Sequence, residues 1–495
     1  MGILSPRYWV VGLIHIVLLL GATHAKDTQS ITTSVHIDHQ WLSSFFTDDG
    51  DTAYAHGQVG FAHLKLAGQY SINQFVFEGA ADGVFMNLYG PNSDIGLSIG
   101  GETLREPRRQ TQIWIPRTAA MTYRSAVGQF TCGLATAQWG EGMLINDGGE
   151  RGRFGRVVST NTSAQCRFAT RLNPKIVAFL AAGQVYRDDQ AQWILGDRAF
   201  IGTAGIKLQL NRGSVGLITA LRHQQDRADP YNPGVSATSL DSVVTDITWQ
   251  SQFNVMGQDV HGRGEVAMIA GQTTRPYLEE TYSSGADILA WGGMTGFGTT
   301  FDTLHTDLEV GYASGDNDPA DNVVRSFSFH SSYGVGLILV DHVLPMLSAR
   351  AVDRINDKGL LDVTPPGLRF TVNQGAVTAL SYVKPKLTWT LGHTFHIDAQ
   401  YIYFMNTADL VDLYQTQLNG GFNANYGGDQ PGSRSLGHEI DMRLTHLVKY
   451  SAGSTQTAEF STFIEGGVLI PGDGIRTVIN EAIFAGIIGM KAGFK

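Results

Sequence analysis

The chain has 495 residues, 43% of them hydrophobic and 16% charged, and its formal net charge is -10. This mildly acidic balance argues against a nucleic-acid partner, which would require a basic surface. The length suffices for several globular domains or for one large barrel. Because no linker rich in Pro or Ser and no change of composition divides the chain, we expect a single folded unit.

The first 25 residues have the layout of a secretory signal peptide. Arg7 precedes the apolar run YWVVGLIHIVLLLG and the small-residue end ATHA, which predicts cleavage after about Ala25 and a mature chain of residues 26–495. A membrane-anchoring helix is the alternative, but the run is short for a span. No Cys follows the predicted cut, so a lipid anchor is not expected. Beyond it there is no run of about 18 apolar residues, so a mature chain in a membrane would have to be a closed β-barrel.

The stretch DSVVTDITWQSQFNV, from residue 241, alternates apolar and polar residues. Val243, Ile247 and Trp249 share one face of an extended chain, whereas Asp246 and Gln250 share the other, because successive side chains of a strand point to opposite sides. Such a strand belongs either to a globular sandwich or to a membrane barrel. Its length favours the barrel, since globular strands usually have about 5 or 6 residues and membrane-spanning strands about 9 to 11.

Similar segments recur along the chain and are joined alternately by short turns and long connections. Outer-membrane barrels have short periplasmic turns and long outer loops, so this alternation indicates an all-β fold, a transmembrane antiparallel β-barrel. Counting hairpins predicts about 18 strands, within a range of about 16–20. The expected segments are, in chain order, 113–124 with 129–139, 165–172 with 176–186, 201–210 with 215–223, 241–255 with VHGRGEVAMIAGQ, 286–297 with LHTDLEVGYAS, 376–390 with 394–406, 437–449 with 456–469, and 482–494.

Two features leave alternatives open. Residues 315–375 are too many for a simple loop. Either part of this segment folds inward as a constriction or outer lid, with Asp341 and His342 at its apolar stretch, or it contains another pair of strands. Cys132 and Cys166 would meet an oxidising compartment after export, where they either form a disulfide or stay unpaired.

The closing strand IFAGIIGMKAGFK is amphipathic with a near-terminal aromatic residue, and it resembles the recognition signal of bacterial outer-membrane barrels. GLATAQWGEGMLINDG resembles the strand-to-loop element GRQxxxYGxGRL of the alginate-export family, and GYASGDNDPAD resembles that family's AYASGDxxPxDG loop. The resemblance implies a monomeric barrel of 18 strands that exports an anionic polysaccharide through a basic lumen. Leu134 stands where the family often has Arg, and Asn322 replaces a Gly, so we carry over the barrel and not alginate. The loop residues of the second match are Gly311, Tyr312, Ala313, Ser314, Gly315, Asp316, Asp318, Pro319 and Asp321.

If the apolar alternates face lipid, the opposite alternates line the lumen, and we predict a pore wall of mixed charge. Inward bases dominate from 167 to 222 and inward acids from 307 to 465, so a transverse field would favour dipolar or hydrated solutes. Because the inward acids outnumber the bases, an open pore should weakly favour cations. The inward bases are Arg167, Arg171, Lys207, Arg222, Arg263, Arg443 and Lys491. The inward acids are Asp246, Glu265, Asp307, Glu309, Asp398, Glu439, Asp441, Glu459 and Glu465.

These patterns favour a channel in the outer membrane of a Gram-negative bacterium that passes hydrophilic solutes or exports a polysaccharide. The alternative is a non-conducting scaffold barrel for a periplasmic secretion or electron-transfer partner. An enzyme is not expected, because no HExxH, GxSxG or P-loop motif occurs, and no cofactor is implied. Asp316, Asp318 and Asp321 could bind a hard cation, but their spacing is not that of an EF-hand. Solvated turn acids are the favoured interpretation, so we predict no metal site.

Overall fold

The computed structural model describes most of the chain between residues 29 and 494, and the predicted signal peptide lies outside the described residues. The described ranges are 29–49, 53–54, 57–89, 98–99, 102–103, 110–148, 161–227, 237–275, 285–318, 321–356, 370–371, 373–392, 394–452 and 456–494.

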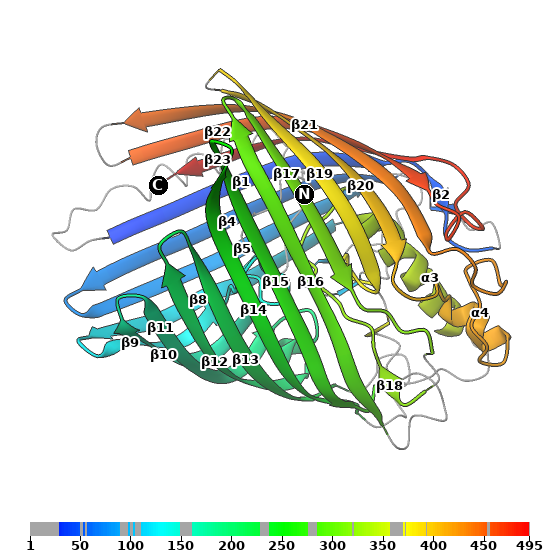
Figure 1. Ribbon diagram of the computed structural model, residues 1–495, viewed down its shortest axis with the longest axis horizontal. Coiled ribbons are helices and arrows are strands. Elements are labelled where there is room, and N and C mark those ends of the chain that lie inside the picture. Colours follow the sequence, from blue (N-terminus) through cyan, green and yellow to red (C-terminus); the bar gives the residue numbers. More distant parts are fainter. Residues whose placement is uncertain are drawn as a thin grey trace, which may run out of the picture.

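Within these ranges, 18 long antiparallel strands form one closed barrel (Figure 1). This confirms the predicted fold class and strand number. Each strand pairs with its neighbours along the chain, and the first pairs with the last, so that Thr33 lies opposite Phe494. The barrel strands are β1 (Gln29–Leu42), β4 (Gly57–Ile72), β5 (Phe75–Tyr89), β8 (Gln110–Ser125), β9 (Gly128–Thr136), β10 (Thr162–Asn173), β11 (Ile176–Arg187), β12 (Arg198–Leu210), β13 (Gly213–Gln225), β14 (Ser239–Val255), β15 (Gln258–Thr273), β16 (Ala286–Phe301), β17 (Leu304–Ala313), β19 (Leu380–Leu391), β20 (Phe395–Asn406), β21 (Ser435–Ala452), β22 (Gln456–Pro471) and β23 (Ile483–Phe494).

The connections alternate in length as the sequence predicts. At one end of the barrel, on the left in Figure 1, the strands are joined by turns of two or three residues, and β23 ends there too. The turn between β14 and β15 shows the local cause: Met256 and Gly257 both have positive φ, of 51° and 86°. Two-residue hairpin turns need this conformation to match the twist of the strands they join. We call this end of the barrel the short-turn end.

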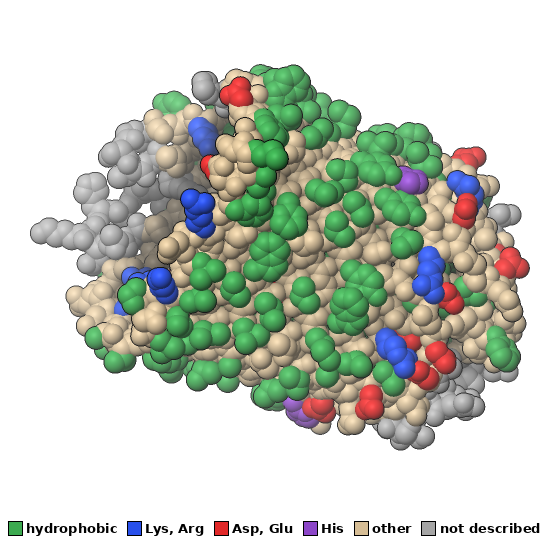
Figure 2. Space-filling view, viewed as in Figure 1, with side chains coloured by type: hydrophobic (Ala, Val, Ile, Leu, Met, Phe, Trp, Pro, Cys, Tyr) green, Lys and Arg blue, Asp and Glu red, His purple; other side chains and the backbone are tan. Residues whose placement is uncertain are grey.

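The outer surface of the barrel is apolar, as the alternation in the sequence predicts. On β14, Val243 and Ile247 are 42% and 48% exposed on the outside, while Asp246 between them is 1% exposed on the inside. Figure 2 shows hydrophobic side chains spread over the strands and most charged side chains near the two ends. This distribution fits a wall that contacts hydrocarbon at its middle and polar surroundings at its ends.

Cys132 of β9 and Cys166 of β10 form a disulfide and lie directly opposite one another in the strand register. The alternative of two unpaired thiols is therefore wrong. Cys166 alternates with Gln165 and Arg167, which line the lumen, so the disulfide lies on the outer face of the wall.

The long connection between β17 and β19 folds into the barrel instead of adding a hairpin to the wall, so of the two alternatives for this segment the inward fold is correct and the extra pair of strands is wrong. Its described part contains β18 (Val323–Val324), which pairs with β16, followed by the π-helix η2 (Leu339–Val343) and α3 (Leu344–Asn356). α3 packs against α4 (Leu413–Leu418) of the next long connection. We call residues 325–356 the plug. The remaining short elements are β2 (Phe45–Phe46), β3 (Ala53–Tyr54), β6 (Ser98–Ile99), β7 (Glu102–Thr103) and η1 (Trp193–Leu195).

None of the helices in the described part of the chain is both long enough and apolar enough to cross a membrane.

Candidate functional site

A single buried carboxylate on β21 holds the start of η2. Glu439 is 0% exposed and accepts backbone hydrogen bonds from Leu337, Ile338 and Leu339, at 2.5, 2.8 and 2.9 Å. The first N–H groups of a helix have no acceptor within the helix, so the Glu439 carboxylate supplies the acceptor oxygens that the start of η2 lacks. Gly336 leaves room for it, since a Cβ there would lie 2.6 Å from Glu439 Oε1. Glu439, predicted to line the pore, therefore binds the plug.

The apolar side chains of the plug pack against the wall and exclude water from part of the lumen. Phe327, Leu339 and Leu347 of the plug, with Ile402 and Phe404 of β20, are all 0% exposed and belong to one core cluster. Complete burial of such a side chain stabilises a fold by about 1.5–3 kcal/mol. The plug is therefore part of the core of the protein.

The inward acids of β17 form ion pairs with bases of β15 and β19. Glu309 pairs with Lys384 Nζ of β19 and Arg263 Nη2 of β15, both at 2.8 Å, and accepts a hydrogen bond of 2.8 Å from Tyr382. Arg263 also binds Asp307 through two hydrogen bonds, of 2.6 and 2.9 Å. The strand register places these residues in line across β15, β16, β17 and β19. This part of the predicted acidic arc is thus a charge-balanced network.

Most of the other predicted inward acids are also buried. The connection between β9 and β10 folds inward, where the Trp139 indole donates to Asp246 at 3.1 Å and the Glu141 backbone N–H donates to Glu265 at 2.5 Å. Glu459 differs, because its side chain is 57% exposed, 3.7 Å from Lys449. The buried acids with partners on the wall are Asp398 with Thr388, Asp441 with Gln400, and Glu465 with Arg443.

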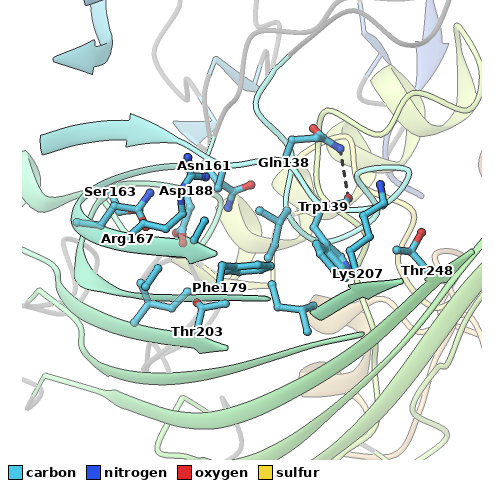
Figure 3. Close-up of a pocket in the computed structure, with 18 of the residues that line it drawn as sticks. Gln138, Trp139, Asn161, Ser163, Arg167, Phe179, Asp188, Thr203, Lys207 and Thr248 are labelled. Atoms are coloured by element: carbon cyan, nitrogen blue, oxygen red, sulfur yellow. Dashed lines mark hydrogen bonds between the residues drawn. The ribbon is translucent and has the colours of Figure 1, made fainter. Parts of the chain in front are cut away.

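Along β10–β14, the inner wall lines a cavity of about 600 Å³ (Figure 3). Arg167 and Lys207 line it together with Trp139 and Phe179 and a set of uncharged polar side chains. Among the residues that the structure describes, neither Arg167 nor Lys207 has a hydrogen-bond or ion-pair partner. Two unpaired cations therefore face this cavity. The uncharged polar residues of its lining are Gln138, Asn161, Thr162, Ser163, Gln165, Thr203, Ser214, Thr248 and Gln250.

A second cavity, of about 630 Å³, lies between the wall, the plug and the long connections, and it shares lining residues with the first. Where the two adjoin, Arg222 pairs with Asp188 at 2.6 Å. Burial raises the pKa of Asp188, but the charge and hydrogen bonds of Arg222 offset this effect, and the pKa lies below its usual value of 3.8. The Asp188 carboxylate thus stays charged beside the junction of the two cavities. The shared lining residues are Ile145, Asn161, Asp188, Ile201 and Ile218.

The structure divides the predicted inward bases into groups with different surroundings. Arg167 and Lys207 face the cavity, Arg222 is paired beside it, and Arg263 and Arg443 neutralise buried acids. Arg171 and Lys491 line neither cavity. The sequence prediction did not include Lys384 and Lys386, although the alternation in SYVKPKLTW indicates their inward direction. Asp188 and Glu141 lie in connections, where no periodic pattern gives a direction.

The acids of the loop motif form hydrogen bonds and ion pairs with residues of their own segment of the chain. Gly311–Ala313 end β17, and Asp316 accepts backbone hydrogen bonds from Asp318 at 3.1 Å and Arg325 at 3.0 Å. Asp321 pairs with the Arg325 side chain at 2.7 Å. Pro319 lies outside the described residues. These partners support the interpretation of the motif acids as turn residues.

No family model and no curated protein matches the chain. Among solved structures, the outer membrane protein OpdK from Pseudomonas aeruginosa is similar, with 10% identity, a TM-score of 0.50, and coverage of 94% of this chain and 98% of that chain. OccD3 (OpdP) from Pseudomonas aeruginosa has 8% identity, a TM-score of 0.49 and coverage of 96% and 93%; OccAB4 from Acinetobacter baumannii has 6%, 0.48, and 95% and 99%. The resemblance to the alginate-export family gains no support from these comparisons. At such low identity the likeness to OpdK shows the fold alone, and the chain has the barrel fold of an outer-membrane protein.

Proposed function

We propose that this protein is a channel of the bacterial outer membrane for small hydrophilic solutes, and that it acts as a monomer. The proposed path runs along β10–β14 through the two adjoining cavities. The observation that carries the proposal is the pair of unpaired cations, Arg167 and Lys207, in a cavity otherwise lined by many uncharged polar groups. Charges without partners inside a barrel are costly to maintain unless water or a solute reaches them.

In the first cavity of this path the accessible charge favours anions, because Arg167 and Lys207 have no partners there among the described residues and Asp188 is paired with Arg222. A count of nine inward acids against seven inward bases would favour cations weakly, but that count presumes that every inward charge reaches the pore. Glu309, Glu439 and Glu265 are at most 5% exposed, and the plug, the wall or the inward connection after β9 supplies their partners. A solute on the path would therefore meet Arg167 and Lys207 more closely than these carboxylates. We thus expect a moderate anion preference.

Export of an acidic polysaccharide, which the family resemblance implied, is a narrower form of this proposal. The part of the wall that carries Arg167 and Lys207 would suit a polyanion as well as a small anion. The plug argues for the small solute, because its buried core would have to move aside to admit a polymer chain. Block of the ionic current by oligomeric uronates at lower concentrations than by the monomer would favour the polysaccharide.

Reversal potentials in planar bilayers under a salt gradient test the anion preference. The wild-type pore should favour anions, and the double variant Arg167→Gln, Lys207→Gln should reduce the anion-to-cation permeability ratio about fivefold, which corresponds to about 1 kcal/mol of electrostatic attraction. Lys175→Gln is the matched control, since this lysine lies in the turn between β10 and β11 and lines neither cavity. A cation-selective wild type, or equal shifts in both variants, would contradict the proposed path.

The second candidate is the non-conducting scaffold barrel, and the buried core of the plug favours it. A scaffold would insert into bilayers without producing single-channel currents. Removal of plug contacts would then create a conductance that the wild-type protein lacks.

A further inference from the structure

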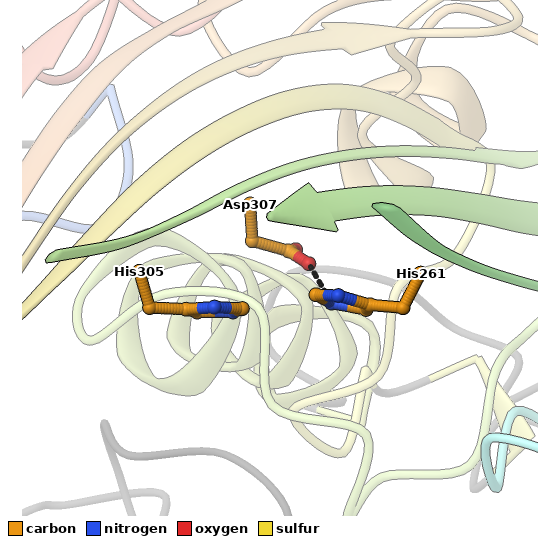
Figure 4. Close-up of side chains that lie close together, drawn as sticks. All are labelled: His261, His305 and Asp307. Carbon is orange, nitrogen blue, oxygen red and sulfur yellow. Dashed lines mark ion pairs between the residues drawn. The ribbon is translucent and has the colours of Figure 1, made fainter. Parts of the chain in front are cut away.

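Three potential metal ligands from β15 and β17 converge near the short-turn end of the lumen (Figure 4). His261 lies on β15, and His305 and Asp307 lie on β17; one ligand atom from each falls within 4.8 Å of the other two. The distance from His261 Nε2 to Asp307 Oδ2 is 3.6 Å. The imidazole centroids are 5.1 Å apart with an interplanar angle of 13°. In Figure 4 the two rings point toward one another, with Asp307 beside the gap between them.

A glycine on the intervening strand makes this convergence possible. Gly298 of β16 lies opposite His261 on one side and Asp307 on the other. A Cβ at this position would lie 2.5 Å from two ring atoms of His261 and 2.8 Å from Asp307 Oδ2. Any side chain here would therefore fill the space in which the two ligands meet.

We propose that His261, His305 and Asp307 bind a divalent first-row transition-metal ion such as Zn²⁺. Zinc sites with three protein ligands use imidazole and carboxylate groups and leave the fourth position to water. With metal-ligand distances of about 2.0–2.1 Å in a tetrahedron, ligand atoms lie about 3.3 Å apart. The separation of 3.6 Å between His261 and Asp307 is close to this value, and rotation of the His305 side chain would complete the set.

The surroundings of His305 suit a ligand role. Its Nδ1 is 3.0 Å from the hydroxyl of Thr300. When Nδ1 donates its proton to that oxygen, Nε2 keeps its lone pair for a metal ion. Ligating histidines usually have a partner of this kind, which fixes the tautomer and the ring orientation.

Arg263 limits the strength of the site without excluding it. It donates two hydrogen bonds to Asp307 and pairs with Glu309 at 2.8 Å. Each carboxylate oxygen has two lone pairs, so Asp307 can accept from Arg263 and bind a metal ion together. The nearby positive charge weakens cation binding, and we expect an exchangeable metal, held less tightly than in structural zinc sites.

Titration of the folded protein in detergent with Co²⁺ tests the site, because four-coordinate Co²⁺ absorbs strongly in the visible range. The wild type should bind one ion per chain at this site, and Zn²⁺ should abolish the absorption. His261→Ala and His305→Ala should each weaken binding at least tenfold. The control is His396→Ala, since His396 of β20 lies 3.2 Å from Thr390, outside the cluster. Heat-dependent electrophoretic mobility checks that each barrel has folded.

A second measurement needs no variant. Zn²⁺ should protect His261 and His305 of the wild-type protein from acylation by diethyl pyrocarbonate, read by mass spectrometry, while His396 stays reactive. Equal Co²⁺ affinity in the wild type and both cluster variants would overturn the proposal. So would equal acylation of His261 and His305 with and without Zn²⁺.

Discussion

Glycines on the inner face of β16 decide which charged side chains can meet. Gly296 lies between Arg263 and Glu309 in the strand register, and a Cβ there would lie 2.8 Å from the guanidinium carbon. Gly298, one inward position further along β16, has the same relation to His261 and Asp307. A strand without side chains at these two points lets groups two strands apart form ion pairs. The short sequence GFG therefore shapes the electrostatics of the lumen.

Substitution of one outward residue tests the contact between wall and lipid. Ile247 lies at the middle of β14 and is 48% exposed on the outer surface. Ile247→Arg should lower the free energy of unfolding in lipid vesicles by about 2–4 kcal/mol, because the charge would lie near the bilayer midplane. Denaturant titration followed by tryptophan fluorescence measures the change.

The matched control for this variant is Gln250→Arg on the opposite face of β14. Gln250 lines the cavity and donates a hydrogen bond of 3.0 Å to Glu141, so an arginine there would gain an acidic partner. It should change the unfolding free energy by less than about 1 kcal/mol. A larger loss for Gln250→Arg than for Ile247→Arg would mean that the two faces are reversed.

At the scale of elements, the position of η2 depends on Glu439. Glu439→Gln keeps one acceptor oxygen but places an NH₂ group near backbone N–H groups that need acceptors. A buried N–H without a partner costs about 1–3 kcal/mol. Hydrogen exchange at residues 337–343 should therefore accelerate about tenfold or more, since exchange follows the local opening free energy.

The exposed acid Glu459 of β22 supplies the control for the plug variant. Glu459→Gln should leave exchange at residues 337–343 unchanged, because this side chain is 57% exposed and pairs with Lys449. Equal exchange rates in Glu439→Gln and the wild type would show that other contacts suffice to hold the plug.

The stability of the long connection that contains α4 should depend on pH. Asp412 caps α4 by accepting a hydrogen bond of 2.7 Å from the Gln415 N–H, and burial raises its pKa from 3.8 to about 6. Between these values the unfolded state loses a proton that the folded state keeps, so stability falls as pH rises from about 4 to 6. The loss is at most about 3 kcal/mol. Asp412→Asn should remove this slope in hydrogen exchange of α4, because Asn still caps a helix but does not titrate. A slope identical in both proteins would contradict the assignment to Asp412.

The wall could be predicted from the sequence, whereas the plug could not. Strand alternation and the lengths of the connections identified every hairpin after residue 112, because each strand must present one apolar face along its whole length. The segment 315–375 has no such repeat. Its backbone groups find partners on distant strands, as the Leu337–Leu339 N–H groups do at Glu439. The sequence does not specify these long-range pairings, so the inward fold and an extra strand pair remained equal alternatives.

At the scale of the whole molecule, the same limit applies to the inward charges. The inward direction of Glu309 and Asp441 follows from alternation, but their burial depends on the plug and on side chains of other strands. Counting inward charges therefore does not give the surroundings of the acidic arc. The cluster of His261, His305 and Asp307 escaped the search for metal motifs because its members belong to different hairpins, whose register the sequence does not give.

The placement of the plug in the chain bears on the order in which the barrel can assemble. The plug leaves β17 and returns to β19, which pair with one another, and two of its polar partners lie on strands of the C-terminal half: Glu309 accepts a hydrogen bond from Tyr333 and Glu439 accepts one from Ile338. A sheet of those strands can therefore hold the plug before the N-terminal strands arrive. Arg350 meets Asp48, just after β1, at 2.6 Å. Closure of β1 on β23 would therefore do two things at once: it would remove the free sheet edges and bring Asp48 to Arg350 of the plug.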